Sequence, residues 1–223
     1  MAISPTAEWS NYYIDLYDAQ ELGIDNKKAI VTSELNIAVS ALNEITGRDL
    51  SIVFELIPDN HKLIVFDTNL DGFTAGNKGT QLGENMTKLN NTVGFNSFDI
   101  GHVVDLGGGG VAYLNALCTS LKGGGQTGGV NGTTFHFVLA HEVGHQLGLD
   151  HSPYQSATMY AAYLGGNGAA DLFTWAARDA AEQGLSVLAA PGFADYGRAL
   201  GCWSGISRKH RLPLVWDEGF PQP

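Results

Sequence analysis

The sequence predicts an α+β fold in which a mixed α/β sheet is followed by a smaller, irregular C-terminal part. Runs of β-forming residues alternate with stretches of helical periodicity along most of the chain. A content of 44% hydrophobic and 10% aromatic residues can bury a core, and 29 glycines predict many tight turns. The 223 residues fit a single domain. We expect an N-terminal subdomain of about residues 1–148 and a C-terminal subdomain of about residues 149–223.

The first elements are predicted from residue type and spacing. Residues 11–17 carry tyrosines and branched apolar residues, which favour a first strand. Residues 25–45 place apolar side chains at helical spacing, with Asp25 as the expected N-cap and Gly47 as the expected C-terminal stop. Two further strands are predicted over residues 50–57 and 62–66, because turn-forming residues lie between them.

The remaining elements surround a glycine-rich stretch. We predict a helix over residues 80–90, a buried strand over residues 98–106, and a short strand or sheet edge over residues 111–117. Residues 122–132 are rich in glycine and are predicted to be a loop. Two more helices are expected over residues 135–147, ended by Gly148, and over residues 169–183.

The charge balance excludes several classes of partner. The chain has 12 basic and 23 acidic residues, a net charge of −11, which argues against binding to nucleic acid or to an anionic membrane. No stretch approaches the roughly 20 apolar residues that span a bilayer. The first five residues lack the basic and apolar regions of a leader peptide, so the protein is either cytosolic or begins after a removed leader. We expect a monomer.

Residues 141–151 carry the strongest functional signal, His-Glu-Val-Gly-His-Gln-Leu-Gly-Leu-Asp-His. Histidines four residues apart share one helix face, so His141 and His145 can hold one ion together. Gly148 permits a sharp turn, for which φ > 0 is expected, and this turn returns His151 to the same ion. Three imidazoles and an open position make a catalytic zinc site. We therefore predict one catalytic Zn²⁺. The alternative, three histidines on a solvated surface, is disfavoured because the pattern fixes so many identities.

Glu142 lies beside the first predicted ligand and is the predicted catalytic residue. Its carboxylate can take a proton from the attacking water and pass it to the leaving amine. Zinc polarises the scissile carbonyl in such sites. The pattern therefore predicts hydrolysis of peptide bonds in a protein or peptide substrate. No serine-hydrolase elbow surrounds Ser152, Ser156 or Ser204.

The spacing of the three histidines, followed by a methionine, resembles the metzincin clan of zinc peptidases. In that clan a tight turn with an invariant methionine lies beneath the three histidines. Residues 157–160 occupy the corresponding place, which implies that Met159 is the Met-turn residue. The resemblance also implies a zincin fold, with a twisted, mostly parallel sheet, an antiparallel edge strand and an active-site helix.

Two subfamilies resemble different parts of the chain. Residues 147–152, with Met159 eight residues after His151, resemble matrixins. Residues 48–54, 98–104 and 107–114 are similar to adamalysin or reprolysin-like peptidases, including bacterial ones. We favour a reprolysin-like protease with a matrixin-like approach to the Met-turn. Astacin-like enzymes place an additional tyrosine ligand where this chain has Ala161, so three histidines are expected to bind the ion.

Substrate-binding residues are implied by the same resemblance. Residues 107–114 resemble the metzincin edge strand above the cleft, which can pair with an extended peptide; an ordinary glycine-rich turn is the alternative. Residues 160–168 line, by resemblance, the pocket next to His141. Their apolar and glycine-rich content predicts a hydrophobic residue just after the scissile bond. The substrate-binding residues so implied are Gly109, Gly110, Val111, Ala112, Tyr160 and Tyr163.

Other titratable residues have more ordinary interpretations. His102 lies in an apolar strand and is expected to be a structural histidine, and His136 has the wrong spacing to share a helix face with His141. Residues 67–72 resemble the first half of a calcium loop, but the twelfth position would be Lys78 instead of glutamate. An Asx-rich turn is the favoured interpretation there, with Ca²⁺ as the alternative.

The two cysteines, Cys118 and Cys202, permit one disulfide and do not require it. Adamalysin-like enzymes link these two regions in a similar way, so the resemblance implies the pairing and a secreted protein. Two free thiols, as in a cytosolic chain, are one alternative. A latency thiolate at Cys202 that caps the zinc is another.

Three functions compatible with these observations remain distinct. The leading one is an active, secreted zinc endopeptidase. The second is a toxin-like or self-processing protease with one physiological target. The third is a non-catalytic binding module that keeps the fold, which loss of Glu142 or of a histidine ligand would indicate; neither residue type is lost.

Overall fold

The computed structural model describes residues 1–50, 52–153 and 157–161. Within them, a four-stranded sheet has the order β1-β2-β4-β3. Its strands are β1 (Ala2–Pro5), β2 (Gly101–Asp105), β3 (Gly109–Ala112) and β4 (Gly125–Gly128). Strands β1, β2 and β4 run parallel, and β3 pairs antiparallel with β4 at the edge. The predicted mostly parallel sheet with an antiparallel edge strand is therefore confirmed.

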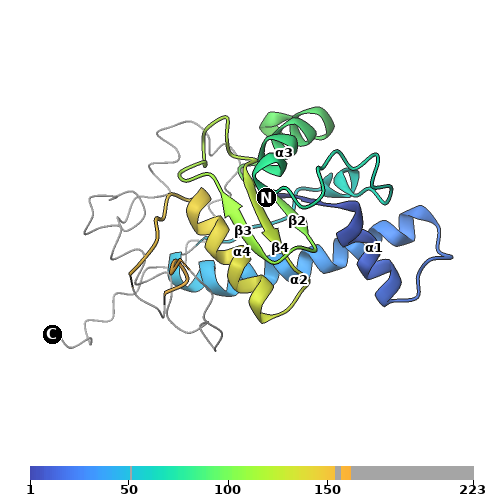
Figure 1. Cartoon of the computed structure of the whole chain (residues 1–223), viewed down its shortest axis with the longest axis horizontal. Helices are drawn as coiled ribbons and strands as arrows, with labels where there is room; N and C mark the ends of the chain where they lie inside the picture. Colours follow the sequence, from blue (N-terminus) through green and yellow to red (C-terminus); the bar gives the residue numbers. More distant parts are fainter. Residues whose placement is uncertain (51, 154–156, 162–223) are drawn as a thin grey trace.

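Helices cover both faces of this sheet (Figure 1). They are α1 (Ala7–Leu16), α2 (Ile24–Leu50), α3 (Lys78–Thr92) and α4 (Thr133–Gln146), with short 3₁₀ turns at Asn60–Leu63 and Phe95–Ser97. Neighbouring residues of β2 show that α3 and α4 lie on opposite faces. A Cβ at Gly101 would meet Leu89 of α3, whereas His102 contacts Gln146 of α4.

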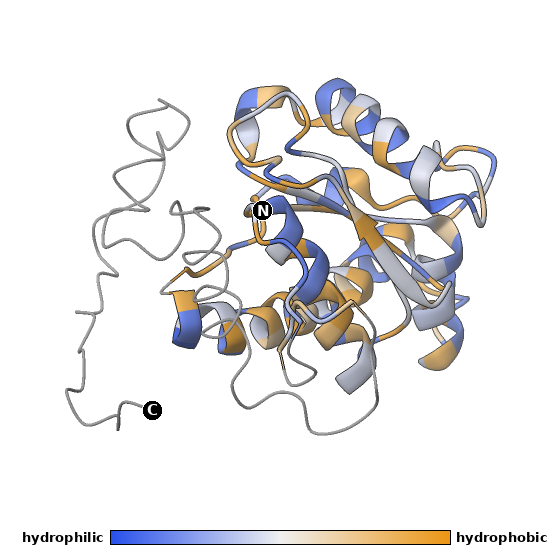
Figure 2. Cartoon of the chain, turned by 60° about the vertical axis from the view of Figure 1, so that its left-hand side comes forward, coloured by the Kyte–Doolittle hydropathy of each residue, from blue (hydrophilic) through white to orange (hydrophobic). Residues whose placement is uncertain are grey.

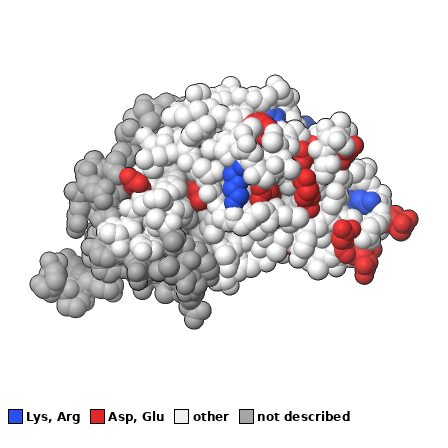
Figure 3. Space-filling view, in the orientation of Figure 1, with Lys and Arg blue, Asp and Glu red and all other residues white. Residues whose placement is uncertain are grey.

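Each face has its own hydrophobic core. The larger core joins α1, α2 and α4 to the sheet and contains Trp9, Leu35, Leu42 and Leu139, all fully buried. The smaller core lies on the α3 side and contains Leu89. Figure 2 shows hydrophobic and hydrophilic bands alternating along the helices, as expected for helices that bury one face. On the face drawn in Figure 3, acidic side chains predominate over isolated basic ones, in line with the net charge of −11.

The prediction of a strand over residues 11–17 was wrong, because this segment belongs to helix α1. The side chain of Thr6 caps the helix by accepting a hydrogen bond from the Trp9 backbone N at 3.2 Å. Trp9, Tyr13 and Ile14 are buried and share one helix face. Burial of this face outweighs the strand preference of the tyrosines.

The predicted strands over residues 50–57 and 62–66 are also absent from the described residues. Leu50 ends α2, and a 3₁₀ turn occupies Asn60–Leu63. The edge of β1 that these strands would have extended is satisfied partly by backbone, since Ile57 N donates to Met1 O at 3.0 Å, and partly by a side chain. The Asn60 amide accepts from Ile3 N at 2.8 Å and donates to Ile3 O at 3.0 Å. A single buried asparagine thus replaces a neighbouring strand at this position.

Several boundaries also differ from expectation. Helix α2 begins at Ile24, so Asp25 lies in its first turn and is not the N-cap, and the helix continues through Gly47. Strand β4 lies inside residues 122–132, which were predicted to be a loop, and β1 was not predicted at all. The edge strand was predicted over residues 111–117, whereas β3 is Gly109–Ala112.

The remaining predictions of regular structure are confirmed where they can be compared. Helix α3 covers residues 80–90, β2 lies within residues 98–106, and α4 covers most of residues 135–147. The predicted helix over residues 169–183 lies outside the described residues, as does most of the predicted C-terminal subdomain. Among the described helices, none is both long and apolar enough to cross a membrane.

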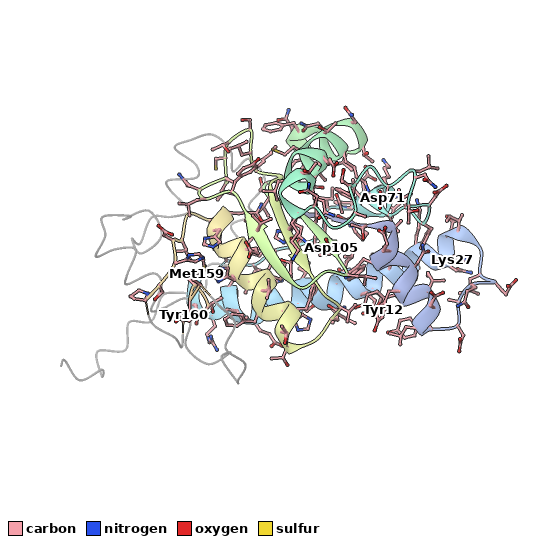
Figure 4. All side chains as sticks on the ribbon, viewed as in Figure 1. Tyr12, Lys27, Asp71, Asp105, Met159 and Tyr160 are labelled. Atoms are coloured by element: carbon pink, nitrogen blue, oxygen red, sulfur yellow. The ribbon has the colours of Figure 1, made fainter. Side chains whose placement is uncertain are left out.

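The loop considered for calcium forms Asx-type hydrogen bonds, as favoured. Asp67 Oδ1 accepts from Asn69 N at 2.9 Å. The two carboxylate oxygens of Asp71 accept from Phe73 N at 2.9 Å and from Ala7 N, the first residue of α1, at 2.8 Å. Figure 4 shows Asp71 near α1. This carboxylate therefore connects the loop to the start of the helix.

Candidate metal centre

Helix α4 and the turn after it bring the three predicted histidines together. His141 and His145 lie one turn apart on α4, and Gly148 follows the helix with φ of 101°. This left-handed conformation, which only glycine adopts readily, reverses the chain so that His151 returns toward the helix. The ligand atoms of His141, His145 and His151 all lie within 4.8 Å of one another, so the group could hold a metal ion.

The orientation of the His141 and His145 rings leaves their Nε2 atoms free to bind a metal. His141 Nδ1 is 2.6 Å from Thr158 O, and His145 Nδ1 is 2.8 Å from Leu149 O. A carbonyl oxygen only accepts hydrogen bonds, so each Nδ1 carries the proton. Each Nε2 then has a lone pair that can bind a metal. Backbone carbonyls thereby fix the tautomer that zinc requires.

The spacing of the nitrogens fits zinc. His145 Nε2 and His151 Nε2 are 3.2 Å apart. Two nitrogens bound at about 2.0–2.1 Å to one tetrahedral ion would be separated by about 3.3 Å. Burial lowers the pKa of His141 to about 4 and lowers the pKa of His145, which keeps both rings neutral, as ligation requires.

The segment after β3 holds the C-terminal end of α4 in place. Asn115 N donates to His145 O at 2.8 Å, and Leu117 N donates to Gln146 O at 3.0 Å. These bonds satisfy carbonyls that have no partner within the helix. A Cβ at Gly148 would lie 3.3 Å from the Asn115 side chain. Gly148, which lies in the turn between His145 and His151, therefore packs against the segment that follows β3.

Met159, the implied Met-turn residue, lies in the described segment 157–161 that follows the third histidine. It is fully buried within the larger core. The turn is closed by Tyr160 N donating to Ala157 O at 3.0 Å, and Ser152 N donates to Met159 O at 2.8 Å. The preceding residue, Thr158, supplies the carbonyl that orients His141. Figure 4 shows Met159 and Tyr160 beside the end of α4.

Glu142 is buried between α4 and the edge strand. Only 6% of its surface is exposed, and burial raises the pKa of its carboxyl to about 7, with the charge of Lys78 acting in the opposite direction. A group whose pKa lies near neutrality can both accept and donate a proton. Strand β3 passes directly over this carboxylate, because a Cβ at Gly110 would lie 2.5 Å from Glu142 Cγ.

Because of this close approach, a residue larger than glycine does not fit at position 110. We expect Gly110→Ala to displace Glu142, since the new Cβ would also lie 2.7 Å from Gln126 O. The free energy of unfolding should fall by about 1–3 kcal/mol, and turnover should fall by at least about tenfold, because small displacements of a catalytic group are costly. Urea unfolding and peptide cleavage rates measure the two effects. Gly108→Ala is the matched control, since nothing lies within 4 Å of its Cβ position; equal losses in both variants would contradict the steric argument.

A buried hydrogen-bond network, which we did not predict, ties α4 to the sheet. His102 Nδ1 is 2.8 Å from Gln146 Oε1, and His102 Nε2 is 2.8 Å from Thr127 Oγ1. Gln146 Nε2 also donates to Gly101 O at 2.9 Å. Gly125 leaves room for the network, because its Cβ would lie 2.4 Å from His102 Nδ1. The expectation that His102 is structural is confirmed, and its partner Gln146 directly follows His145.

The burial of His102 predicts a pH-dependent stability. Burial lowers the pKa of His102 in the folded protein to about 4 from 6.5, although the Gln146 hydrogen bond raises it. Below pH 6.5 the unfolded chain binds more protons than the folded one. The free energy of unfolding therefore decreases as the pH falls from about 6.5 toward about 4, with a loss on the order of 2 kcal/mol from this group at pH 5.

Urea unfolding at pH 7 and pH 5 measures this dependence. His102→Asn cannot titrate in this range, so its loss of stability between the two pH values should be smaller than that of the wild type. The exposed His61, replaced by asparagine, serves as the control and should behave as the wild type. An unchanged pH dependence in His102→Asn would assign the effect to other groups.

The other histidine considered, His136, does not join the cluster. Its Nε2 is 3.1 Å from Asn131 Oδ1, and Asn131 in turn donates to Glu34 of α2. Of the implied substrate-binding residues, Gly109, Gly110, Val111 and Ala112 form β3, and Tyr160 lies in the Met-turn, while Tyr163 is outside the described residues.

The fold and site together define a metallopeptidase architecture, in which a helix with two histidines lies below an antiparallel edge strand. The sequence model of metallo-peptidase family M12B, reprolysin-like, matches residues 32–152, more than half of the chain. The chain belongs to this family, which implies a peptidase. The matched region extends from α2 through the third histidine and ends before Met159. No curated protein matches the chain.

Proposed function

We propose that this protein is a zinc-dependent endopeptidase that cleaves internal peptide bonds of proteins or peptides. The observation that supports this proposal is the convergence of the three imidazoles within 4.8 Å, next to the buried carboxylate of Glu142. His141, His145 and His151 would bind the ion through their Nε2 atoms and leave one position open.

The separate roles of zinc and Glu142 follow from the chemistry of the site. Zinc, when bound, supplies Lewis-acid polarisation of the scissile carbonyl and charge stabilisation. Glu142 takes the proton from the attacking water and delivers it to the nitrogen of the leaving amine. Backbone oxygens of Thr158 and Leu149 keep the histidine rings in one tautomer throughout.

We propose that substrates bind in an extended conformation along the free edge of β3. This strand is at the edge of the sheet and passes over Glu142, so a peptide paired with it would place its backbone beside the catalytic carboxylate. We assign Gly109, Gly110, Val111, Ala112, Tyr160 and Tyr163 to substrate binding. The expected hydrophobic preference just after the scissile bond involves residues 160–168, most of which lie outside the described residues.

Two other functions compete with a general endopeptidase. A non-catalytic binding module of the same fold is disfavoured because Glu142 and the three histidines are all present and grouped. A toxin-like or self-processing protease would share this site, so it differs only in the breadth of its substrates.

Digestion of casein and of a peptide library, with and without a chelator, tests the proposal. We expect cleavage within chains that the chelator abolishes and that stoichiometric zinc restores. Products trimmed one residue at a time would indicate an exopeptidase, a single cleaved target would indicate narrow specificity, and zinc-loaded protein that cleaves no peptide would contradict the proposal.

We also propose that Cys118 and Cys202 form a disulfide and that the protein acts in an oxidising, extracellular compartment. No cysteine is free among the described residues, which supports this proposal; Cys202 lies outside them. A bridge closing so long a loop would contribute about 4–5 kcal/mol in the chain-entropy model. Thiol titration of the unfolded, unreduced protein should detect no reactive thiol, and detection of two would rule the bridge out.

A further inference from the structure

Lys78, the first residue of α3, reaches across to the start of the edge strand. Its Nζ donates a hydrogen bond to Gly108 O and lies 3.5 Å from the Cβ position of Gly109. Its Cε lies 3.7 Å from the Cβ position of Gly107. Lys78 is half-buried. A lysine ammonium has three donors, so the bond to Gly108 leaves others for a ligand.

Lys78 and Glu142 lie on opposite sides of β3. The Cβ position of Gly110 faces Glu142 of α4, whereas that of the preceding Gly109 faces Lys78 of α3. Side chains of a strand alternate between the two faces of a sheet. Residues directly opposite each other on paired strands point to the same face, so a peptide bound along β3 follows the same alternation.

The direction of the peptide relates Lys78 to a particular substrate residue. Antiparallel pairing is slightly more stable per residue than parallel pairing. In that direction, substrate residues after the scissile bond extend toward the beginning of β3. The residue that supplies the leaving amine lies beside Gly110, because Glu142 must reach that nitrogen. The next residue then lies beside Gly109 with its side chain directed toward α3.

Lys78 forms no ion pair among the described residues, and the carboxylate beside it is that of Asp105, whose Oδ1 lies 3.3 Å from the Cβ position of Gly107. The described residues form ion pairs between Arg48 and Asp49 and between Lys62 and Asp59, and none of these includes Lys78. Two other lysines on this side of the sheet, Lys88 and Lys122, lie over aromatic rings instead.

We propose that Lys78 forms a subsite for an acidic substrate side chain, aspartate or glutamate, at the second residue after the cleaved bond. This inference rests on the proposed endopeptidase activity and names the substrate class for the same cleft. The hydrophobic preference expected for the first residue after the bond is compatible with it, because the two side chains point to opposite faces of β3.

Three peptides that differ only at this second position, with glutamate, glutamine or lysine, test the proposal. For the wild type we expect kcat/KM to be about 5–30 times higher for glutamate than for lysine, as for a partly shielded ion pair. The ratio should shrink in high salt. Lys78→Gln should bring the ratio close to one, and Lys78→Glu should invert it.

Ratios between peptides separate specificity from structural damage. If Lys78 only holds the glycine loop, its variants will lower the rates for all three peptides by the same factor, which would overturn the proposal. Lys27→Glu is the matched control, since Figure 4 places Lys27 far from Met159 and Tyr160; its ratio should equal that of the wild type. Equal wild-type rates on the three peptides would overturn the proposal without any variant. Zinc-loaded wild type that cleaves none of a broad library would instead refute the endopeptidase activity on which it rests.

Discussion

Replacement of Glu142 by glutamine should abolish most of the turnover while leaving zinc and fold in place. Glutamine has the same shape but cannot accept the proton of the attacking water. General-base catalysis contributes about 10²–10⁴-fold, so kcat should fall by that factor. The residue is 6% exposed, and burial of a charge is costly, so the metal-free variant should unfold at a higher urea concentration than the wild type at pH 8.

This combination of lower activity and undiminished stability distinguishes a catalytic residue from a structural one. Zinc content, measured at equal protein concentration, should be the same in both proteins. Glu21→Gln, at an exposed position, is the control and should keep wild-type activity. Full activity in Glu142→Gln at equal zinc content would remove Glu142 from the mechanism.

The site could be predicted from the sequence because its information is local. His141, His145 and Gly148 act through helix periodicity and one positive φ, both of which depend on neighbouring residues. Helices α3 and α4 and strand β2 were predicted for the same reason. The edge position of β3 required the resemblance to known peptidases, since its four residues give no distinctive period.

Several of the wrong predictions depend on tertiary contacts. Gly125 and Gly128 look like loop residues, yet β4 needs them because His102, Gln146 and the Gly107 backbone occupy the space of their side chains. The Asn60 side chain, instead of a strand, pairs with the backbone of Ile3, which is 57 positions away. The pairing of His102 with Gln146 spans 44 positions. No local pattern contains such information.

The same long-range contacts stabilise the fold and support the helix that carries the candidate site. The His102 network joins β2, β4 and the end of α4, where His145 lies. The sheet thus contacts the end of α4 through Gln146, while the carbonyl of Thr158, which precedes Met159, orients the ring of His141. The three candidate ligands are identifiable from their spacing alone, but the residues that contact them are scattered along the chain.

Replacement of His145 by alanine should abolish stoichiometric zinc binding and activity together. His145 lies between the other two ligands, with ring centroids 4.6 Å from His141 and 4.8 Å from His151. Substitutions of residues that merely support a ligand cost about 10–100-fold in metal affinity, so loss of a direct ligand should cost more than this. Zinc affinity is measured by competition with a chromophoric chelator, and activity is measured at the same free zinc concentration.

His136, which also lies on α4, gives the control for His145→Ala. His136 is bonded to Asn131 and lies outside the three-histidine group, so His136→Ala should retain zinc and cleave peptides at the wild-type rate. Removing His145 also deletes the bond to Leu149 O, which helps to hold the turn before His151. His145→Asn preserves a hydrogen-bonding side chain and separates this effect from metal ligation. If His145→Ala keeps one tightly bound zinc, or if His136→Ala loses it, the ion is held by a different set of residues.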